Sequence, residues 1–224
     1  MVYASELNGR TLTLGVSGML WERSLVMIDQ ETESLWSHQL GEALRGPLKG
    51  QTLEVSPSVM ADWKVWKEAH PNTTAVVMPR TSNKYRNNLH RESRQLLIGL
   101  TESGQSKAWD LRYLRDYPGC NDQVAERKVL VVYHEPSGTA AIYDRILEGQ
   151  ELDFEFVDRR ITDRQTGSYW DPLTGRALTS PMLGKRLVRL HGIISTHDAC
   201  YTFHPNTVLA GSESHDEPSD RSSK

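Results

Sequence analysis

One short segment near the end of the chain concentrates side chains that bind transition metals. Imidazole nitrogen and thiolate sulfur are ligands that zinc and copper prefer. His197, Cys200 and His204 are spaced three and four residues apart, so on a helix they would share one face. The segment therefore predicts a copper or zinc site, and the competing interpretation is a core-facing helix in which Cys200 packs as a small apolar residue. The candidate ligands are His191, His197, Cys200 and His204.

A second set of chemically capable residues occurs twice, as the pattern Asp-x-x-Thr-x-Ser-x-Trp. Its two carboxylates could act as a pair of acid and base groups, or the two copies could line a ligand site. The competing and favoured interpretation is a folding role, because Asp bonds the backbone of its own turn and Trp packs in a core. The residues are Asp29, Thr32, Ser34 and Trp36 in the first copy, and Asp163, Thr166, Ser168 and Trp170 in the second.

A hydrolase is a further alternative, since Ser, His and Asp are all present. The Gly-x-Ser-x-Gly elbow that follows a strand and opens a helix is missing, and the nearest approach is Ser17 in Gly-Val-Ser-Gly. A catalytic nucleophile therefore has weak support.

The repeated motif is part of an internal duplication of the chain. When the sequence is shifted by 134 positions, residues 29–53 align without a gap on residues 163–187, and ten positions are identical. The identities include Gly41 with Gly175 and Gly50 with Gly184. So long a period indicates two domain-sized halves, and a cleft between them is expected, lined by the same Trp and polar residues from each side.

Each half should end in a short helix. Helical spacing of apolar residues predicts a helix from about Ser58 to His70, stopped by Pro71, and a second one through His197 to His204, stopped by Pro205. Only one of the four candidate metal ligands, His204, has a His counterpart in the first half, and the helix dipole favours His in a last turn.

The strand signals complete the predicted fold. Residues 128–133 are a continuous apolar run typical of a buried strand. Residues 139–143 are predicted to pair with it across a turn, and residues 96–100 are a further predicted strand. A short helix is expected over 108–115 and an exposed polar loop over 84–94. We expect a mainly β, β-rich α+β fold: two similar halves of short antiparallel strands, each followed by a short helix. The predicted division is 1–75, first half; 76–125, connecting segment; 126–210, second half; and 211–224, disordered tail.

Composition excludes some partners. Lys and Arg number 26 against 29 Asp and Glu, a net charge of −3, so nucleic acid is not expected. The sequence has no apolar run long enough for a membrane span. Residues after Met1 lack the pattern of a signal peptide, which predicts a cytoplasmic protein if Met1 is the true start. The two cysteines are expected to be unpaired thiols.

The paired blocks and the two His-Pro-Asn-Thr helix ends, at His70 and His204, resemble the bacterial family known as domain of unknown function 3179. The resemblance runs from about Leu12 to Pro205 and implies no established reaction. Members of that family typically begin their first half with a strand, a Cys-Pro-x-Cys-Gly turn and another strand. Here Tyr3 aligns with Tyr143, so the first half starts after that element, and in the second half His134 and Ser137 stand where the cysteine pair would be.

The resemblance bears on compartment and partners. A signal peptide upstream of this start would make the protein periplasmic or exported. A missing strand pair would leave an unpaired sheet edge in the first half, through which chains could self-associate. We expect a non-enzymatic ligand-binding or interaction module, with metal binding through the His191–His204 segment as the first alternative and a hydrolase as the second. The cofactor is undetermined beyond that transition metal.

Overall fold

The computed structural model describes residues 1–56, 58–76, 96–158 and 160–210. Antiparallel sheets joined by short helices dominate it, which confirms the predicted mainly β class. The polar loop expected over 84–94 and the tail over 211–224 lie outside the described residues. Among those residues, every helix is too short or too polar to cross a membrane.

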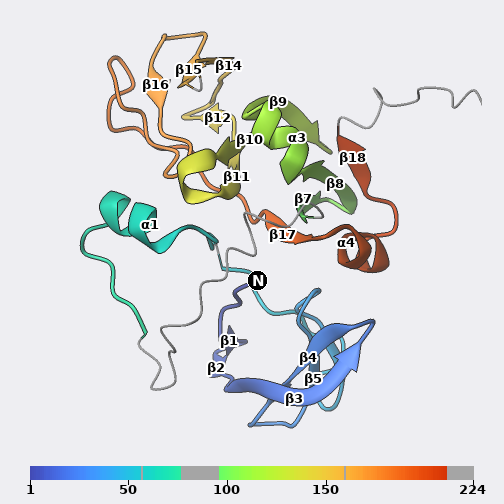
Figure 1. Ribbon diagram of the computed structural model, residues 1–224. Helices are drawn as coiled ribbons and strands as arrows, with labels where there is room; N and C mark the ends of the chain where they lie inside the picture. The colour runs from blue at the N-terminus through green and yellow to red at the C-terminus, as the bar shows by residue number, and fades with distance from the viewer. Residues whose placement is uncertain (57, 77–95, 159, 211–224) are drawn as a thin grey trace, which may run out of the picture.

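The first half is built from hairpins that follow one another along the chain. A small hairpin comes first, and a four-stranded antiparallel sheet in the order β3-β4-β5-β6 follows it. The sheet occupies the lower part of Figure 1. The strands are β1 (Glu6–Leu7), β2 (Arg10–Thr11), β3 (Leu14–Trp21), β4 (Ser24–Asp29), β5 (Leu35–Ser37) and β6 (Ala43–Arg45).

The second half repeats this order. Its small hairpin, β12 with β13, precedes the antiparallel sheet β14-β15-β16, and a single bridge between Trp170 and Ala177 replaces the last strand. The strands are β12 (Ile146–Leu147), β13 (Gln150–Glu151), β14 (Phe154–Val157), β15 (Arg160–Asp163) and β16 (Tyr169–Trp170).

Two further sheets form the centre of the molecule, in the orders β17-β7-β8-β18 and β11-β10-β9. They contain the strands predicted over 96–100, 128–133 and 139–143. The segment 76–125, predicted as a connection, supplies β7, β8 and β9 to these sheets. The strands are β7 (Leu96–Glu102), β8 (Gln105–Asp110), β9 (Gly119–Val124), β10 (Arg127–His134), β11 (Thr139–Asp144), β17 (Ile193–Thr196) and β18 (Val208–Ala210).

The helices begin later than the sequence pattern predicted. Helix α1 (Trp63–Ala69) starts after Asp62, whose carboxylate accepts from Lys64 N and Val65 N, so Ser58 is not its cap. Helix α3 (Leu111–Asp116) starts after Asp110, and residues 108–110 belong to β8. In both places an aspartate stops the preceding extended backbone and caps the helix. Helix α4 (His197–Phe203) begins after Thr196, as expected, and η1 (Glu135–Ser137) is a 3-10 turn.

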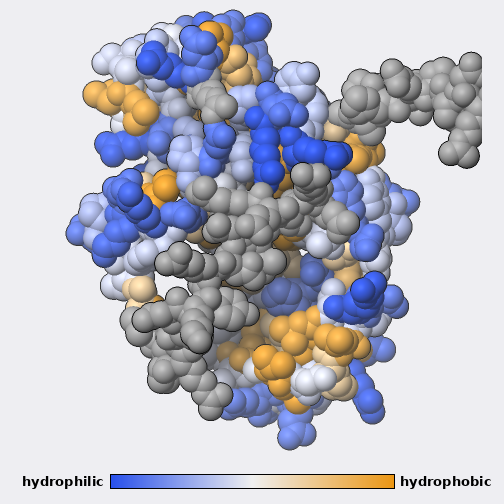
Figure 2. All heavy atoms as spheres, in the orientation of Figure 1, coloured by the Kyte–Doolittle hydropathy of each residue, from blue (hydrophilic) through white to orange (hydrophobic). Residues whose placement is uncertain are grey.

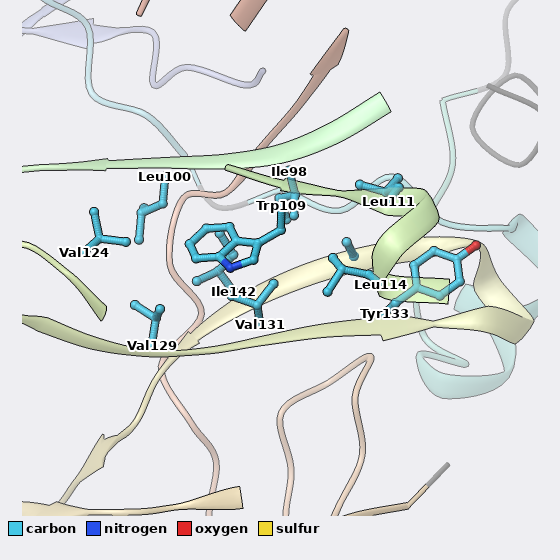
Figure 3. Packing of buried hydrophobic residues seen from close by; sticks show 11 residues of the cluster. Ile98, Leu100, Trp109, Leu111, Leu114, Val124, Val129, Val131, Tyr133 and Ile142 are labelled. Carbon is cyan, nitrogen blue, oxygen red and sulfur yellow. The ribbon is translucent and has the colours of Figure 1, made fainter. Parts of the chain in front are cut away.

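The largest core lies between the central sheets. Trp109, completely buried, lies at its centre, and Ile98 of β7, Val131 of β10 and Ile142 of β11 contribute to the same cluster (Figure 3). The β12–β16 unit and the first half have their own, smaller clusters around Trp170 and Trp36. The Trp of each repeated motif therefore sits in the core of its own half.

The duplication is visible in detail at one glycine of each half. Gly41 and Gly175 both have φ +67°, and a Cβ on either would lie 2.5 Å from the ring of Tyr3 or Tyr143. Because the same Tyr ring covers the same left-handed Gly in both copies, the halves share their packing as well as their sequence.

Candidate functional site

The first copy of the repeated motif forms a closed set of hydrogen bonds around a completely buried carboxylate. Asp29 Oδ2 accepts from the Trp36 indole Nε1 at 2.8 Å, and Asp29 Oδ1 accepts from the Thr32 amide at 2.6 Å and its hydroxyl at 2.8 Å. The Ser34 amide adds a bond to Oδ2 at 3.2 Å. Ser34 Oγ in turn lies 2.6 Å from Thr32 Oγ1 and accepts from the Leu48 amide, which fastens the next loop.

The second copy repeats these contacts almost atom for atom. Asp163 accepts from the Trp170 indole at 2.8 Å, the Thr166 amide at 2.6 Å and the Thr166 hydroxyl at 2.8 Å. Ser168 Oγ accepts from Thr166 and from the Met182 amide. The motif therefore has the same structural role in both halves: its hydrogen bonds connect a turn, a core Trp and the following loop.

Burial of Asp29 acts to raise its pKa, but the hydrogen bonds from Trp36, Thr32 and Ser34 outweigh burial and hold the pKa below the usual value. A carboxylate in this state is a poor proton acceptor. Strands β4 and β15, which end in the two motif carboxylates, lie at opposite ends of the molecule in Figure 1, so Asp29 and Asp163 cannot act on one substrate. A ligand-binding role for the eight motif residues stays a prediction.

The four candidate metal ligands do not converge. His197 Nε2 lies 3.3 Å from Asp110 Oδ2, while Cys200 is buried and its Sγ lies 3.8 Å from Thr207 Oγ1. Burial raises the pKa of Cys200, which opposes the thiolate form that a metal needs. Across the residues that the structure describes, no three His, Cys, Asp or Glu side chains form a group that could hold a metal ion. Metal binding therefore stays a prediction, without a preformed cage to support it.

The two serines with a possible catalytic setting, Ser17 and Ser137, have structural contacts. Ser17 Oγ donates to Val26 O at 2.6 Å and accepts from the Met19 amide, and so fastens an irregularity in β3. A closer Ser–His contact exists at the turn between β10 and β11, where His134 Nδ1 lies 2.6 Å from Ser137 Oγ. Ser137 is completely buried, so this contact stabilises the turn and cannot reach a substrate.

The largest site shared by both halves is a cleft of about 430 Å³. Apolar side chains line most of it, and the first half contributes Tyr3, Leu40 and Val55. The paired tryptophans expected there are instead in the two cores. Local sequence patterns could not reveal this cleft, because its walls come from segments that are distant in the chain. The lining residues are Met1, Tyr3, Gln39, Leu40, Val55, Leu100, Thr101, Glu102, Arg127, Val188, Arg189, Leu190, His191, Ile193 and His204.

The two arginines of the cleft are already engaged. Arg127 contacts Glu102 at 2.8 Å and Asp144 at 2.7 Å, and these hydrogen bonds raise its pKa. Arg189 donates to the Tyr143 hydroxyl at 2.6 Å and to Leu173 O. The imidazoles of His191 and His204 and the amide of Gln39 are further polar groups in the lining of the cleft. Burial lowers the pKa of His204, which favours its neutral form.

A second, larger hollow of about 680 Å³ lies over the β8–β9 region and the loop after α4. Its walls are mixed, with Lys107, Gln123 and Asn206 beside apolar residues such as Phe203 and Val208. Residues of the connecting segment 76–125 and of the second half form this hollow, and the first half contributes none of its lining residues.

Comparison with known proteins identifies one family that matches this chain. Residues 1–92 and 82–222 each match the family model described as protein of unknown function (DUF3179). Two matches along one chain agree with the internal duplication. Neither the curated proteins nor the solved structures contain a match.

Proposed function

Since this chain belongs to the DUF3179 family, whose description assigns no activity, we propose that it is a non-enzymatic binding protein whose ligand lies in the cleft between its halves. The observation that carries the proposal is the 430 Å³ cleft with walls from both halves. Small-molecule sites are commonly concave, largely apolar and placed where two structural units meet.

The lining defines the class of ligand. Leu40, Val55, Val188 and Leu190 offer an apolar wall. The charge of Arg127 is balanced by Glu102 and Asp144, and the guanidinium of Arg189 donates to the Tyr143 hydroxyl and Leu173 O. A strongly charged ligand would lose much of its hydration against this mainly apolar wall. The proposed ligand is therefore a neutral and mainly apolar small molecule, with one or two polar groups that reach His191, His204 or Gln39.

The inert state of the reactive groups supports the non-enzymatic part of the proposal. The motif carboxylates are saturated with hydrogen bonds inside their own turns, and Ser137 is sealed from solvent. The groups that face the cleft are suited to orient a ligand by hydrogen bonds.

The test uses 2-naphthol, a bicyclic aromatic probe with one hydroxyl, and measures its binding by calorimetry and ligand-detected NMR. Half-buried Val55 lies in the cleft wall, and Val55→Trp should fill the space and abolish binding. Val157→Trp, at an exposed position in the second half, is the matched control and should bind as the native chain does. Equal binding by the native chain and Val55→Trp would place the probe elsewhere and remove the cleft as the site.

Metal binding is the second candidate function, favoured by one observation: His191 and His204 both line this cleft. Elemental analysis of the purified chain, with Cys200→Ser as the comparison, tests it. Stoichiometric copper or zinc that Cys200→Ser loses would support the site. A chain without bound metal after equilibration with either ion would exclude it.

A further inference from the structure

The two halves differ most in one hairpin. Contacts of the small first hairpin align at a shift of 140 positions, since the Leu12 amide bonds Ser5 O as the Leu152 amide bonds Arg145 O. The motif that follows the larger hairpin aligns at 134, with Asp29 on Asp163. The difference of six residues lengthens the β3–β4 hairpin relative to β14–β15.

This longer hairpin carries an exposed apolar surface, which we call the β3 patch. The exposed fractions are 74% for Val16, 45% for Met19, 71% for Leu20 and 39% for Trp21. Figure 2 shows hydrophobic residues gathered in the lower part of the molecule, where Figure 1 places the first-half sheet. Contiguous apolar patches on a soluble surface commonly mark interaction sites.

Val16 and Leu20 of the β3 patch lie on the core side of the sheet, whereas Trp21, the next residue after Leu20, lies on the other face. Val16 pairs with Met27, and Met27 pairs with the buried Trp36, so the three side chains share one face. Leu20 likewise pairs with Leu25, which packs against the first-half core. The apolar face of the sheet therefore continues beyond the core into solvent.

In the second half, the position equivalent to Val16 is covered by another strand. Phe156 has the register position of Val16, because it pairs with Ile161, which pairs with Trp170. Strand β9 covers this position, with Gly119 directly against the Phe156 ring. From the same strand, the Asn121 side chain bonds Phe154 O at 2.7 Å and Phe154 N at 3.0 Å, and so completes the open edge of β14. The equivalent surface is thus one that an extended strand occupies.

We propose that the β3 patch is the interface of a symmetric dimer, in which β3 of a second copy lies antiparallel against β3. The strand suits such a contact, because it lies at the edge of its sheet, has no charged residue in its eight positions and is extended on both sides of the irregularity between Val16 and Leu20. Natural edge strands commonly carry charges that prevent pairing, and β3 does not. A two-fold axis lets one surface serve as its own partner.

Charges at the two ends of β3 also favour a second copy. Glu22 and Arg23 form the turn at one end, and at the other end lie Arg10 and Glu31, whose carboxylate accepts from the Thr13 amide at 2.7 Å. An antiparallel pair brings the turn of each copy beside the opposite end of the other. Each end carries one acidic and one basic residue, so this arrangement allows Glu22 to meet Arg10 and Arg23 to meet Glu31.

Two features hold the interface in place and limit its growth. The Trp21 ring packs edge-on against Phe203 of α4, with centroids 5.2 Å apart, so the tip of the hairpin is anchored to the second half. The irregularity that Ser17 fastens interrupts the edge between Val16 and Leu20. A broken edge prevents a long uninterrupted ladder, so the expected assembly is a reversible dimer instead of a fibre.

Sedimentation velocity of the full chain over a wide concentration range tests the proposal. The native chain should form dimers, and Leu20→Lys should raise the dimer dissociation constant by at least about tenfold. Val157→Lys, which changes an exposed apolar residue on a hairpin of the second half, should leave it unchanged. Circular dichroism of each variant checks that it is folded. A native chain that remains monomeric throughout overturns the proposal, including the case in which another protein binds the patch.

A charge exchange tests the orientation. Arg23→Glu should weaken the dimer because two carboxylates then meet, and the double variant Arg23→Glu with Glu31→Lys should restore it. Rescue would support the antiparallel arrangement. Additive weakening by the two changes would contradict it.

Discussion

The indole Nε1 of Trp36 donates a 2.8 Å hydrogen bond to Oδ2 of the completely buried Asp29, and Trp170 makes the same bond, of the same length, to Asp163. The distance in sequence is seven residues in each case. In each half, one carboxylate thus accepts hydrogen bonds from the core Trp, the hydroxyl of the turn and the backbone of the turn.

Removal of the Asp29 carboxylate should destabilise the fold. Asp29→Ala leaves the indole of Trp36 and the amides of Thr32 and Ser34 without acceptors in a buried site, and we expect a loss of about 3 kcal/mol in the free energy of unfolding. Urea denaturation followed by tryptophan fluorescence measures this. Glu6→Ala, at an exposed position, is the control and should change stability by less than about 0.5 kcal/mol. A loss for Asp29→Ala as small as that of Glu6→Ala would contradict a structural role.

Stability should fall in acid because of the same carboxylate. The pKa of Asp29 is lower in the folded chain than its ordinary value of 3.8. Its contribution is therefore fully present above the ordinary pKa and is lost as the pH falls through the folded pKa. The free energy of unfolding, measured from neutral pH to below about pH 4, should decline less steeply for Asp29→Asn than for the native chain. Parallel declines for the two proteins would argue against the assignment.

Gly41 should tolerate no side chain. Its φ of +67° is a conformation that L residues rarely adopt, and an added Cβ would lie 2.5 Å from the Tyr3 ring. Gly9 also has a positive φ, +74°, but a Cβ there would meet nothing within 4 Å. Gly9→Ala should therefore cost about 1 kcal/mol from the backbone alone, and Gly41→Ala clearly more. Thermal unfolding measures the stability of both variants. Equal losses of stability would show that the Tyr3 ring moves aside without a loss of stability.

Both thiols should be unreactive in the folded protein. Burial raises the pKa of Cys120 to about 12 and also raises that of Cys200, so neither is a thiolate near neutral pH. A thiol reagent should label the native chain slowly and both cysteines promptly after denaturation. Fast labelling of one native thiol would show that its segment opens to solvent. Cys120→Ser and Cys200→Ser variants would identify which one reacts.

The sequence alone revealed most of the local organisation. The shift of 134 positions predicted two similar halves, and the Asp-x-x-Thr-x-Ser-x-Trp pattern predicted a turn with a core Trp, which is where Trp36 and Trp170 lie. These features were accessible because turn bonds, caps and strand periodicity join residues close together in the chain. The late start of α1 and α3 escaped prediction, because several candidate caps compete locally and the packing of the preceding segment selects among them.

Tertiary structure decided the features that concern binding. The cleft joins Val55, Leu100 and His191, which no short-range pattern relates. His197 and Cys200 of α4 contact Asp110 and Thr207, which lie outside that helix. The β3 patch is a similar case. Residues 14–21 read as an ordinary strand, and whether Val16 is covered depends on what packs across the sheet. Sequence specifies what each segment can form, whereas contacts between distant segments decide which surfaces remain open to a partner.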